Sequence, residues 1–526
     1  MKKNISLRLL PSEAVNDQLI NEHAARSLSI EPTTITGINI LRHSIDARGK
    51  QTYILLNVEV FIDEPYHATL YHPVNFEDVR HAPQRVIIIG GGPAGLFAAL
   101  KLIENGIQPI ILERGKDVRS RRRDLAAMNK NGIVNPESNY CFGEGGAGTY
   151  SDGKLYTRST KRGDLPRILG LLHQFGAPRS ILYEAHPHIG TNKLPQIITA
   201  VRAQIEDAGG LFLFDQKVTD LVIQADSVTG VVTATGDRFT ANAVIIATGH
   251  SARDMFELLY YKKILIEAKP FALGVRIEHP QQLIDSIQYH CPVRDEYLPP
   301  AAYSLVQQVQ NRGVFSFCMC PGGIIAPAAT APGEIVVNGW SPSKRNNPFA
   351  NSGLVVSVEA GDYAKNGNPD PLAAMKFQAM VEQRAYAAGG GALVAPAQRL
   401  VDFVDKKASS TLPDCSYLPG IATASLDTVL PGFISDALRK ALPLFGRKMK
   451  GYFTNEAVLV ATESRTSSPV RIPRDPVTLQ HPQVRSLYPC GEGAGYAGGI
   501  VSAAMDGERV VAAIITVLQP SLSAQP

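Results

Sequence analysis

Two cysteines have the spacing best suited to thiol chemistry. Cys318 and Cys320 form a C-x-C pair within residues 317–323. Residues i and i+2 of an extended strand point to the same face, so both thiols are expected to face one pocket. Such a pair can be redox-active, but cysteines on a strand also serve as small core residues. The sequence leaves both interpretations open.

Three further side chains are candidates for substrate chemistry. Arg465 can bind a carboxylate bidentately, or it can form a structural ion pair with Glu463 or with another domain. His188 can act as a general acid or base, or it can be a hydrogen-bonded interior histidine. Lys154 ends a glycine-rich segment, residues 140–154, and can belong to a site or to the surface. We take Lys154, Cys318, Cys320 and Arg465 as the catalytic candidates.

Residues 85–100 contain the clearest structural motif of the chain. A run of β-branched residues, typical of a buried parallel strand, leads into a glycine turn and then a helix. Glycines 90, 92 and 95 form the pattern G-x-G-x-x-G. Gly90 permits the tight turn, Gly92 lets the backbone approach a pyrophosphate, and Gly95 lets the helix pack closely on the strand. The sequence therefore predicts a dinucleotide-binding turn.

The elements after this turn agree with that prediction. Pro93 and Ala94 open the helix, whose first-turn N–H groups and positive dipole end suit phosphates. Glu113 ends the second predicted strand, residues 109–113, at a spacing suited to ribose hydroxyls. A Glu rather than an Arg there disfavours a 2′-phosphate, so we expect FAD or NAD rather than NADP. Arg114 is a further candidate for the pyrophosphate contact.

The order of the remaining segments resembles the FAD-binding half of flavoproteins of the glutathione-reductase type. An apolar strand ends in the Ala-Thr-Gly of residues 247–249, and a second strand and glycine turn, residues 485–507, come near the end of the chain. A simple NAD-dependent dehydrogenase needs no such closing segment, so FAD is preferred. The resemblance implies these FAD contacts: Gly145 and Gly146 beside the isoalloxazine ring, Val218 beside the adenine, Thr248 and Gly249 at the returning turn, and Gly491, Glu492, Gly498, Gly499 and Ile500 in the closing segment.

A closer resemblance covers residues 85–515. The sequence is similar to the largely uncharacterised FAD-dependent dehydrogenases of bacteria and plastids, whose N-terminal unit also has a counterpart here. This resemblance implies an FAD-binding oxidoreductase and no particular substrate. Glu492 stands where glutathione-reductase-type flavoproteins usually have an Asp that binds the ribityl chain. The matching segments are residues 90–124, 139–155, 187–194, 274–280, 317–323, 463–471 and 488–507.

We expect an α/β protein in three parts. A doubly wound, Rossmann-like FAD-binding domain is discontinuous, with residues 84–255 and 451–526. Residues 256–450 form a β-rich α+β insert that supplies the substrate side. Residues 1–80 form a small α+β domain with the order β-α-β-β. The insert has no second G-x-G-x-x-G after a strand, so any NAD(P)H would bind only transiently, as a reductant over the flavin.

Composition limits the partners. The chain has 526 residues with 52 basic and 48 acidic side chains, a net charge too small to predict nucleic-acid or membrane binding. The six cysteines form no C-x-x-C pair and no metal-ligand pattern, so we expect no metal. Few cysteines and no long apolar segment favour a cytoplasmic protein.

These observations favour hydride transfer between a small-molecule substrate and flavin N5. Two alternatives stay open at this point. The first is a flavoprotein that acts on RNA, because some tRNA-modifying enzymes share the opening motif. The second is a non-enzymatic redox sensor that uses the flavin or the Cys318–Cys320 pair. The oligomeric state is not indicated by the sequence.

Overall fold

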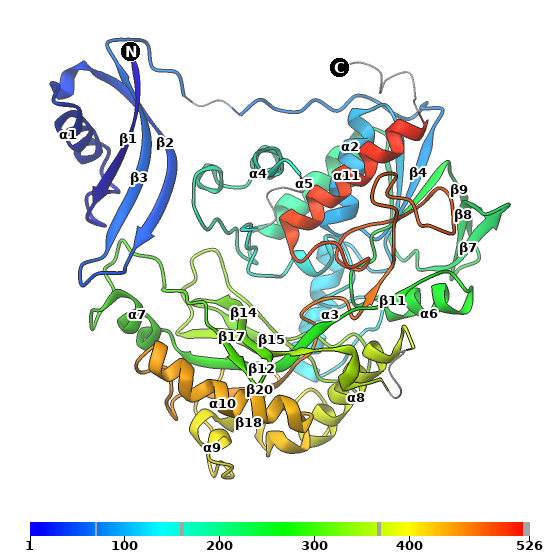
Figure 1. Ribbon diagram of the computed structural model, residues 1–526. Helices are drawn as coiled ribbons and strands as arrows, with labels where there is room; N and C mark the ends of the chain where they lie inside the picture. Colours follow the sequence, from blue (N-terminus) through cyan, green and yellow to red (C-terminus); the bar gives the residue numbers. More distant parts are fainter. Residues whose placement is uncertain (69–70, 158–162, 365–369, 519–526) are drawn as a thin grey trace.

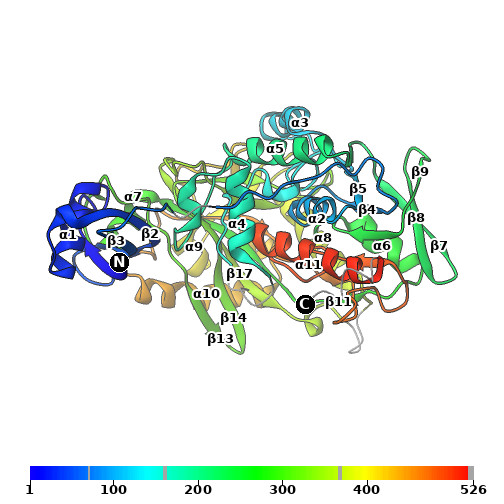
Figure 2. The ribbon, with the colours of Figure 1, turned by 90° about the horizontal axis from the view of Figure 1, so that it is seen from above.

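The computed structural model describes residues 1–68, 71–157, 163–364 and 370–518. Three parts are distinct in Figure 1: a small N-terminal domain, a domain built on a parallel sheet, and an insert built on a large, mostly antiparallel sheet. Residues 71–84 lead to the parallel sheet without forming a helix or a strand. Figure 2 places the N-terminal domain and the parallel sheet at opposite ends of the molecule.

The parallel sheet has five strands and is assembled from distant parts of the chain. Its tail strand pairs in parallel with a strand more than 240 residues earlier, Val244 opposite Leu487. All other neighbours in this sheet are also parallel. Segments from both parts of the predicted discontinuous domain therefore meet in one sheet, and the domain boundaries stay a prediction. The order is β22 (Leu487–Pro489), β10 (Ala243–Ile246), β4 (Arg85–Ile89), β5 (Gln108–Leu112) and β6 (Leu211–Leu213).

Different elements cover the two faces of this sheet. Alternate residues of β4 separate the cores: Val86 and Ile88 pack with the helices, and Ile87 and Ile89 pack on the other face. Helices α2 (Pro93–Glu104), α4 (Leu165–Gln174), α5 (Leu194–Asp207) and α11 (Ile500–Leu518) cover the first face. The second face is covered by α6 (Arg253–Tyr261) and by a meander of β7 (Val218–Gln224), β8 (Ser227–Thr233) and β9 (Arg238–Thr240).

The insert is built on a seven-stranded mixed sheet. Its strands follow the order β13 (Val306–Val309), β14 (Arg312–Cys320), β17 (Phe349–Val358), β12 (Phe271–Pro280), β20 (Val458–Glu463), β18 (Ala395–Arg399) and β19 (Ile421–Thr423). Strand β20 pairs with both β12 and β18, so the sheet continues to Glu463, past the boundary predicted at residue 450. Residues 457–462 are uncharged and buried, as a strand of either domain would be. The sequence therefore does not show whether this strand belongs to the insert or to the FAD domain.

Helices and short strands complete the insert. Helix α10 extends from Gly432 to Lys448, with Pro443 inside it. Strands β15 (Ile324–Pro327) and β16 (Val337–Trp340) form a separate pair beside β14. Strands β11 (Glu267–Ala268) and β21 (Val470–Arg471) pair where the chain enters and leaves the insert. The remaining helices are α3 (Val118–Asn131), α7 (Gln281–Tyr289), α8 (Ala373–Ala388) and α9 (Leu400–Val404).

The N-terminal domain has the order β-α-β-β expected from the sequence: β1 (Lys2–Leu9), α1 (Asp17–Leu28), β2 (Ile35–Asp46) and β3 (Tyr53–Ile62). The side-chain oxygen of Asn16 caps α1 by accepting hydrogen bonds from the N–H groups of Gln18 and Leu19, so the helix begins at Asp17. His43 joins this domain to the loop after α4 through Glu184, with Nδ1 and Oε2 3.0 Å apart. Within the described ranges, no helix has the length and apolarity to cross a bilayer.

Candidate flavin site

A long cavity lies between the parallel-sheet domain and the insert. On one side it is lined by the turn after β4, the glycine-rich segment 146–154, the turn after β10 and the segments around Glu492 and Ile500. On the other side it is lined by β14, β15, β16 and the end of β20. Parallel strands open their carboxyl ends toward this space, where α/β folds bind ligands. Eighteen of the twenty-one residues predicted for the site line the cavity, all except Gly95, Gly145 and Gly491.

The glycine turn has the geometry that a dinucleotide needs. Gly90 has φ +106°, and a Cβ there would lie 2.6 Å from the carbonyl oxygen of Ala247. At Gly92 a Cβ would meet nothing in the protein closer than 3.9 Å, so its bare backbone faces the cavity. Pro93 and Ala94 begin α2 there, and the free N–H groups of its first turn point toward the same space.

Three of the predicted residues, Gly95, Gly145 and Gly491, do not line the cavity, and their contact with FAD stays a prediction. A Cβ at Gly95 would lie 2.1 Å from the Gly90 carbonyl oxygen, so this glycine packs α2 on β4. At Gly145 a Cβ would lie 2.1 Å from Thr149 Oγ1. At Gly491 it would lie 2.9 Å from Ala94 Cβ. These glycines permit close packing of the backbone that shapes the cavity.

Glu113 occupies the predicted place beside the turn. Its Oε2 accepts the N–H of Gly91 at 2.7 Å, and its Oε1 accepts the N–H groups of Gly115 and Gly143 at 2.9 Å. The residue is 4% exposed and lines the cavity. An ionised carboxylate has about four acceptor sites, so one acceptor site remains for a hydroxyl of a ligand. Glu113 thus fixes two loops and still presents an acceptor to the cavity.

Arg114 also lines the cavity, but its guanidinium already has protein partners. It pairs with Asp254 at 2.8 Å and with Glu137, and it lies 4.3 Å above the ring of Phe142. Lys217 pairs with the same two carboxylates. This network joins the β5 end to α6 and to the strand that starts at Val218, so Arg114 holds the wall together. Its contact with the pyrophosphate stays a prediction.

The closing segment brings a buried carboxyl to the cavity. Burial raises the pKa of Glu492 to about 7, and Lys269 opposes this rise only in part. His250 Nε2 lies 4.0 Å from Glu492 Oε1, but burial and the neighbouring Arg465 and Arg253 lower the pKa of His250 to about 4. His250 is therefore neutral at pH 7 and supplies no counter-charge. Gly498, Gly499 and Ile500 line the cavity next to this carboxyl, at the start of α11.

Two polar atoms show that this cavity fits FAD. Thr248 Oγ1 and Gln216 Oε1 are buried and have no hydrogen-bond partner among the described residues, although both side chains line the cavity. Buried polar atoms are normally hydrogen-bonded, so these two need partners from a ligand. FAD carries ribose, ribityl and amine groups that can supply them. Together with the bare backbone at Gly92, these residues fit the cofactor.

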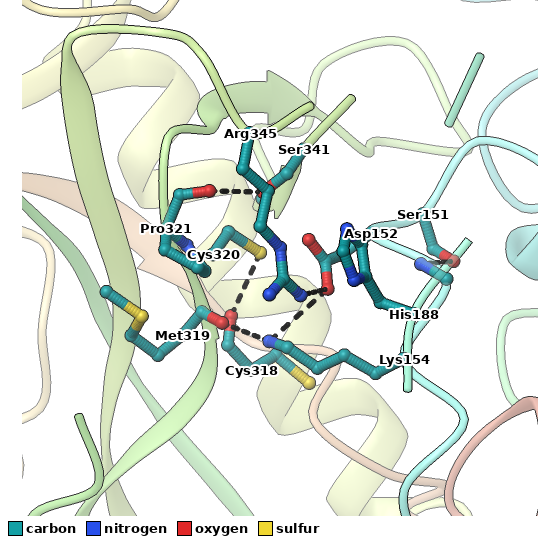
Figure 3. A network of polar contacts seen from close by, with 12 residues as sticks. Ser151, Asp152, Lys154, His188, Cys318, Met319, Cys320, Pro321, Ser341 and Arg345 are labelled. Atoms are coloured by element: carbon teal, nitrogen blue, oxygen red, sulfur yellow. Dashed lines mark hydrogen bonds and ion pairs between the residues drawn. The ribbon is translucent and has the colours of Figure 1, made fainter. Parts of the chain in front are cut away.

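The insert side of the cavity differs from the prediction for Cys318 and Cys320. Both line the cavity, but a bulge between β14 and β17 follows Phe317, and Cys318 has φ +43°. Both residues therefore face one pocket, as expected, but the bulge breaks the two-residue alternation and their side chains do not share one face of the strand. Figure 3 shows the two sulfur atoms pointing apart, with Cys320 Sγ donating to the Cys318 carbonyl oxygen at 3.2 Å. Burial raises the pKa of the Cys318 thiol to about 11 and that of Cys320 as well.

Arg465 is enclosed by acidic partners. Its guanidinium contacts Glu382, Glu334 and Thr330, and Arg253 from α6 pairs with the same two glutamates. Glu382 Oε2 contacts both arginines, and Oε1 accepts from Arg465 Nε and Ser464 Oγ; the two arginines lower the pKa of Glu382 to about 2. Of the alternatives raised for Arg465, this geometry supports a structural ion pair, with Glu382 and Glu334 rather than Glu463 as its partners. Its role in substrate binding stays a prediction.

Glu463 has a different partner, which the sequence did not reveal. Arg276 Nη1 donates to Glu463 Oε2 at 2.7 Å, and its other nitrogens donate to Asn351 and to the Cys318 carbonyl oxygen at 2.7 Å. Arg276 is fully buried. A Cβ at Gly339 would lie 2.2 Å from Arg276 Nη2, so the glycine makes room for this guanidinium under the cavity wall.

Lys154 lies where the glycine-rich segment meets the insert. In Figure 3 its ammonium group points to the carbonyl oxygen of Met319 and to Asp152, whose Oδ2 lies 4.0 Å away. Asp152 is closer to Arg345, at 2.9 Å. His188 Nε2 binds the Ser343 carbonyl oxygen at 3.1 Å, and burial lowers the pKa of His188. The sequence analysis missed Asp152 and Arg345; the only signal was that Asp152 stands within the glycine-rich segment.

Comparison with known protein families agrees with this geometry. The model described as "FAD-dependent protein, C-terminal domain-like" matches residues 270–466, which end close to the observed end of the insert. The "FAD binding domain" model matches residues 84–127, and "Glucose inhibited division protein A" matches residues 195–280. A domain of unknown function matches residues 1–61. FAD is therefore the cofactor, as predicted.

Solved flavoprotein structures are similar only at low scores. Glycine oxidase from Bacillus cereus is 14% identical, with 84% of this chain and 97% of that chain covered and a TM-score of 0.30. A flavin-dependent brominase is 14% identical, with 84% and 81% covered and a TM-score of 0.35. The fold assignment therefore depends on the strand order and the glycine turn described above.

A sequence relative is much more similar. An uncharacterised protein of Clostridium beijerinckii is 39% identical over 515 residues, which cover 94% of this chain and 96% of the relative. This confirms the family resemblance seen in the sequence motifs. The chain belongs to the same family as the clostridial protein, a family of FAD-dependent oxidoreductases.

Proposed function

We propose that this oxidoreductase transfers a hydride between a small-molecule substrate and N5 of FAD. The observation that carries the proposal is the continuity of the cavity. The same space is lined by Gly92 of the dinucleotide turn and by Cys318 and Trp340 of the insert. A substrate bound against the insert is thus held in the same enclosed space as the cofactor.

The residues of the parallel-sheet domain hold and orient the cofactor. FAD supplies hydride acceptance or donation at N5. Glu113 and Gln216 present acceptors at the adenosine end, and the start of α2 presents N–H groups to the phosphates. The start of α11 directs its positive dipole end into the cavity beside Glu492. This dipole favours negative charge at that end of the cavity.

Glu492 is our candidate for holding a proton during turnover. Its pKa of about 7 lets the carboxyl take up or release a proton at neutral pH. The carboxyl also lies next to the start of α11, beside the predicted flavin end. Cys318 and Cys320 are less suited to redox chemistry, because their raised pKa values keep both thiols protonated.

Rapid anaerobic mixing of the purified holoprotein tests this proposal. We expect NADH, NADPH or a member of a metabolite panel to bleach the flavin absorbance band in one kinetic phase. Deuterium at the reacting carbon of that reductant should slow the phase, because the C–H bond breaks with the hydride.

Three outcomes would contradict hydride transfer. The first is purified protein that neither carries nor takes up FAD. The second is bleaching only by dithiols, which would favour the redox-sensor alternative. The third is salt-dependent retention of RNA without turnover of any small molecule, which would favour the RNA alternative.

A further inference from the structure

Most charged side chains that line the cavity have a close counter-ion in the protein. Such pairing is expected, because an unpaired charge in a partly buried site is costly. The pairs have N–O distances of about 3 Å or less: Arg114 with Asp254, Lys217 with Glu137, Glu463 with Arg276, and Arg465 with Glu382. Glu113 is held instead by three backbone N–H groups.

Lys154 is different. Lys154 Nζ forms an ion pair with Asp152, whose Oδ2 lies 4.0 Å away. The same oxygen lies closer to Arg345 Nη2, at 2.9 Å. Two cations thus share one carboxylate, which leaves one positive charge in this group. His188 pairs with the backbone of Lys154, and burial lowers the pKa of His188. The imidazole is therefore neutral at pH 7 and adds no second positive charge to this group. Within the described ranges, this wall of the cavity therefore carries an excess positive charge.

The ammonium group of Lys154 is held at the cavity surface. It donates to the carbonyl oxygen of Met319, which fixes the side chain across the gap between the glycine-rich segment and β14. An ammonium group has three donors, so two remain. The side chain is 36% exposed, and Lys154 lines the cavity. A ligand in the cavity can therefore reach the free donors.

The wall next to Lys154 is mostly apolar. Strands β14, β15 and β16 contribute the side chains of Phe317, Ala326, Pro327, Val337 and Trp340 to the cavity. The neighbouring Glu463 is neutralised by Arg276. This part of the site therefore offers one cation beside an apolar surface.

We propose that Lys154 binds the carboxylate of the substrate, and that the apolar strands hold the rest of the substrate against the flavin. This inference rests on the proposed function, because it assigns a substrate class to the same site. A carboxylate compensates the excess charge and accepts the free N–H donors of Lys154 in a charge-assisted bond. A neutral substrate would leave the charge uncompensated.

Binding of benzoate to the holoprotein tests the proposal, with benzamide as its uncharged counterpart. Binding is measured by the change in the flavin spectrum and independently by calorimetry. We expect benzamide to bind at least about tenfold more weakly than benzoate, the lower end of what a charged hydrogen bond contributes. Acetate, which lacks the ring, should also bind more weakly, because it leaves the apolar wall uncovered.

Variants of Lys154 give the second arm. Lys154→Met should weaken benzoate binding at least about tenfold and leave benzamide binding unchanged, whereas Lys154→Arg should restore most of the benzoate affinity. The control is Lys407→Met, at a surface lysine that is 68% exposed. Flavin content should be the same in all four proteins, which shows that they are folded.

Several results would overturn the proposal. These are no binding of benzoate, equal binding of benzoate to Lys154→Met and to the wild type, and binding of benzamide as tight as that of benzoate. A shift of the flavin midpoint potential in Lys154→Met with unchanged benzoate affinity would show that Lys154 serves the reduced flavin instead. If benzoate follows the expected pattern but no deuterium effect is found on flavin reduction, the proposed function fails and the carboxylate site stands.

Discussion

The two walls of the cavity are built by different kinds of interaction. The wall from the parallel-sheet domain consists largely of backbone, with Gly90, Gly92 and Glu113 within 24 residues of one another. The wall from the insert depends on buried ion pairs between distant residues. Arg276 and Glu463 are 187 residues apart, and Arg465 and Glu382 are 83 apart. The cofactor wall is therefore a local product of one strand-turn-helix unit, and the insert wall is a product of the whole fold.

This difference implies two opposite weaknesses. A backbone surface that must approach a ligand fails when an atom is added to it. A buried ion pair fails when one partner is removed, because the other charge is then left without compensation. A variant that adds a methyl group to the first wall should therefore lose FAD affinity. A variant that removes a charge from the second wall should lose folding stability.

The largest effect is expected from Arg276→Met. Glu463, 1% exposed, loses its counter-ion, and breaking a buried pair in this way costs about 3–5 kcal/mol. The protein has a single tryptophan, Trp340, which lies on β16 in the insert, so its fluorescence reports unfolding of this part. We expect a large fall in the urea midpoint measured by this signal.

The double variant Arg276→Met/Glu463→Gln is the control. It removes both charges, so it should recover much of the lost stability. If the single variant is as stable as the wild type, or the double variant is no better than the single one, the insert wall does not depend on this ion pair.

A smaller loss, confined to the cofactor, is expected from Gly92→Ala. The added methyl group meets no protein atom closer than 3.9 Å, so the FAD-free protein should unfold at the wild-type midpoint. In the holoprotein the methyl group occupies the approach to the pyrophosphate. An overpacking cost of about 1–3 kcal/mol corresponds to an FAD Kd about 5- to 150-fold higher.

Gly361→Ala is the matched control, because this glycine is exposed and a Cβ there has no neighbour within 4 Å. Its FAD affinity should equal that of the wild type. A Gly92→Ala protein that binds FAD normally would show that the turn does not approach the cofactor closely. The two walls would then be less different than we argue.

The same contrast explains what the sequence could predict. The turn at Gly90, the acidic residue Glu113 and the tail segment at Glu492 follow short-range patterns, because glycine conformation and helix dipoles act within a few residues. All three line the cavity, and distant segments pair in one parallel sheet. Gly145 and Gly491 do not line it, because a glycine permits close approach equally to a ligand or to another backbone, and their contact with FAD stays a prediction.

The insert wall could not be predicted in the same way. Glu463 was one of two alternative partners raised for Arg465, but in the fold Glu463 pairs with Arg276, on an adjacent strand of the large sheet. The orientation of the cysteines depends on a bulge set by the register between β14 and β17. Register and cross-strand partners depend on tertiary pairing, which spacing along the chain does not encode.

A pH-dependent effect is expected from Glu492→Gln in the FAD-free protein. Burial raises the folded pKa of Glu492 to about 7, above its ordinary value of 4.5, so the folded state holds its proton to higher pH than the unfolded state. The stability of the wild type should therefore fall as pH rises from about 4.5 to 7, and the variant lacks this loss. The difference should reach on the order of 1 kcal/mol, because the side chain is 27% exposed and solvent screens part of the cost.

Thermal midpoints between pH 5 and 9 (about two units on either side of the folded pKa) measure this difference. The exposed Glu456→Gln is the control, and its profile should run parallel to that of the wild type. A Glu492→Gln protein whose midpoint follows the wild type at every pH would show that water reaches this carboxyl freely. The cofactor wall would then hold no proton near neutral pH.

The smallest effect is expected from Cys318→Ser, which tests whether the insert wall has a redox role. The Cys318 side chain faces the cavity, and its thiol points away from Cys320, so the substitution should change the free energy of unfolding by no more than about 0.5 kcal/mol. The raised pKa of about 11, against an ordinary 9, leaves about a hundredfold less thiolate at pH 8, so iodoacetamide should label Cys318 correspondingly slowly in the wild type.

Mass spectrometry after mild oxidation should find both thiols free, because their divergence opposes a bond between them. Rapid formation of a Cys318–Cys320 disulfide, lost in Cys318→Ser together with a change in flavin reduction, would show instead that this wall carries electrons as well as charge pairs.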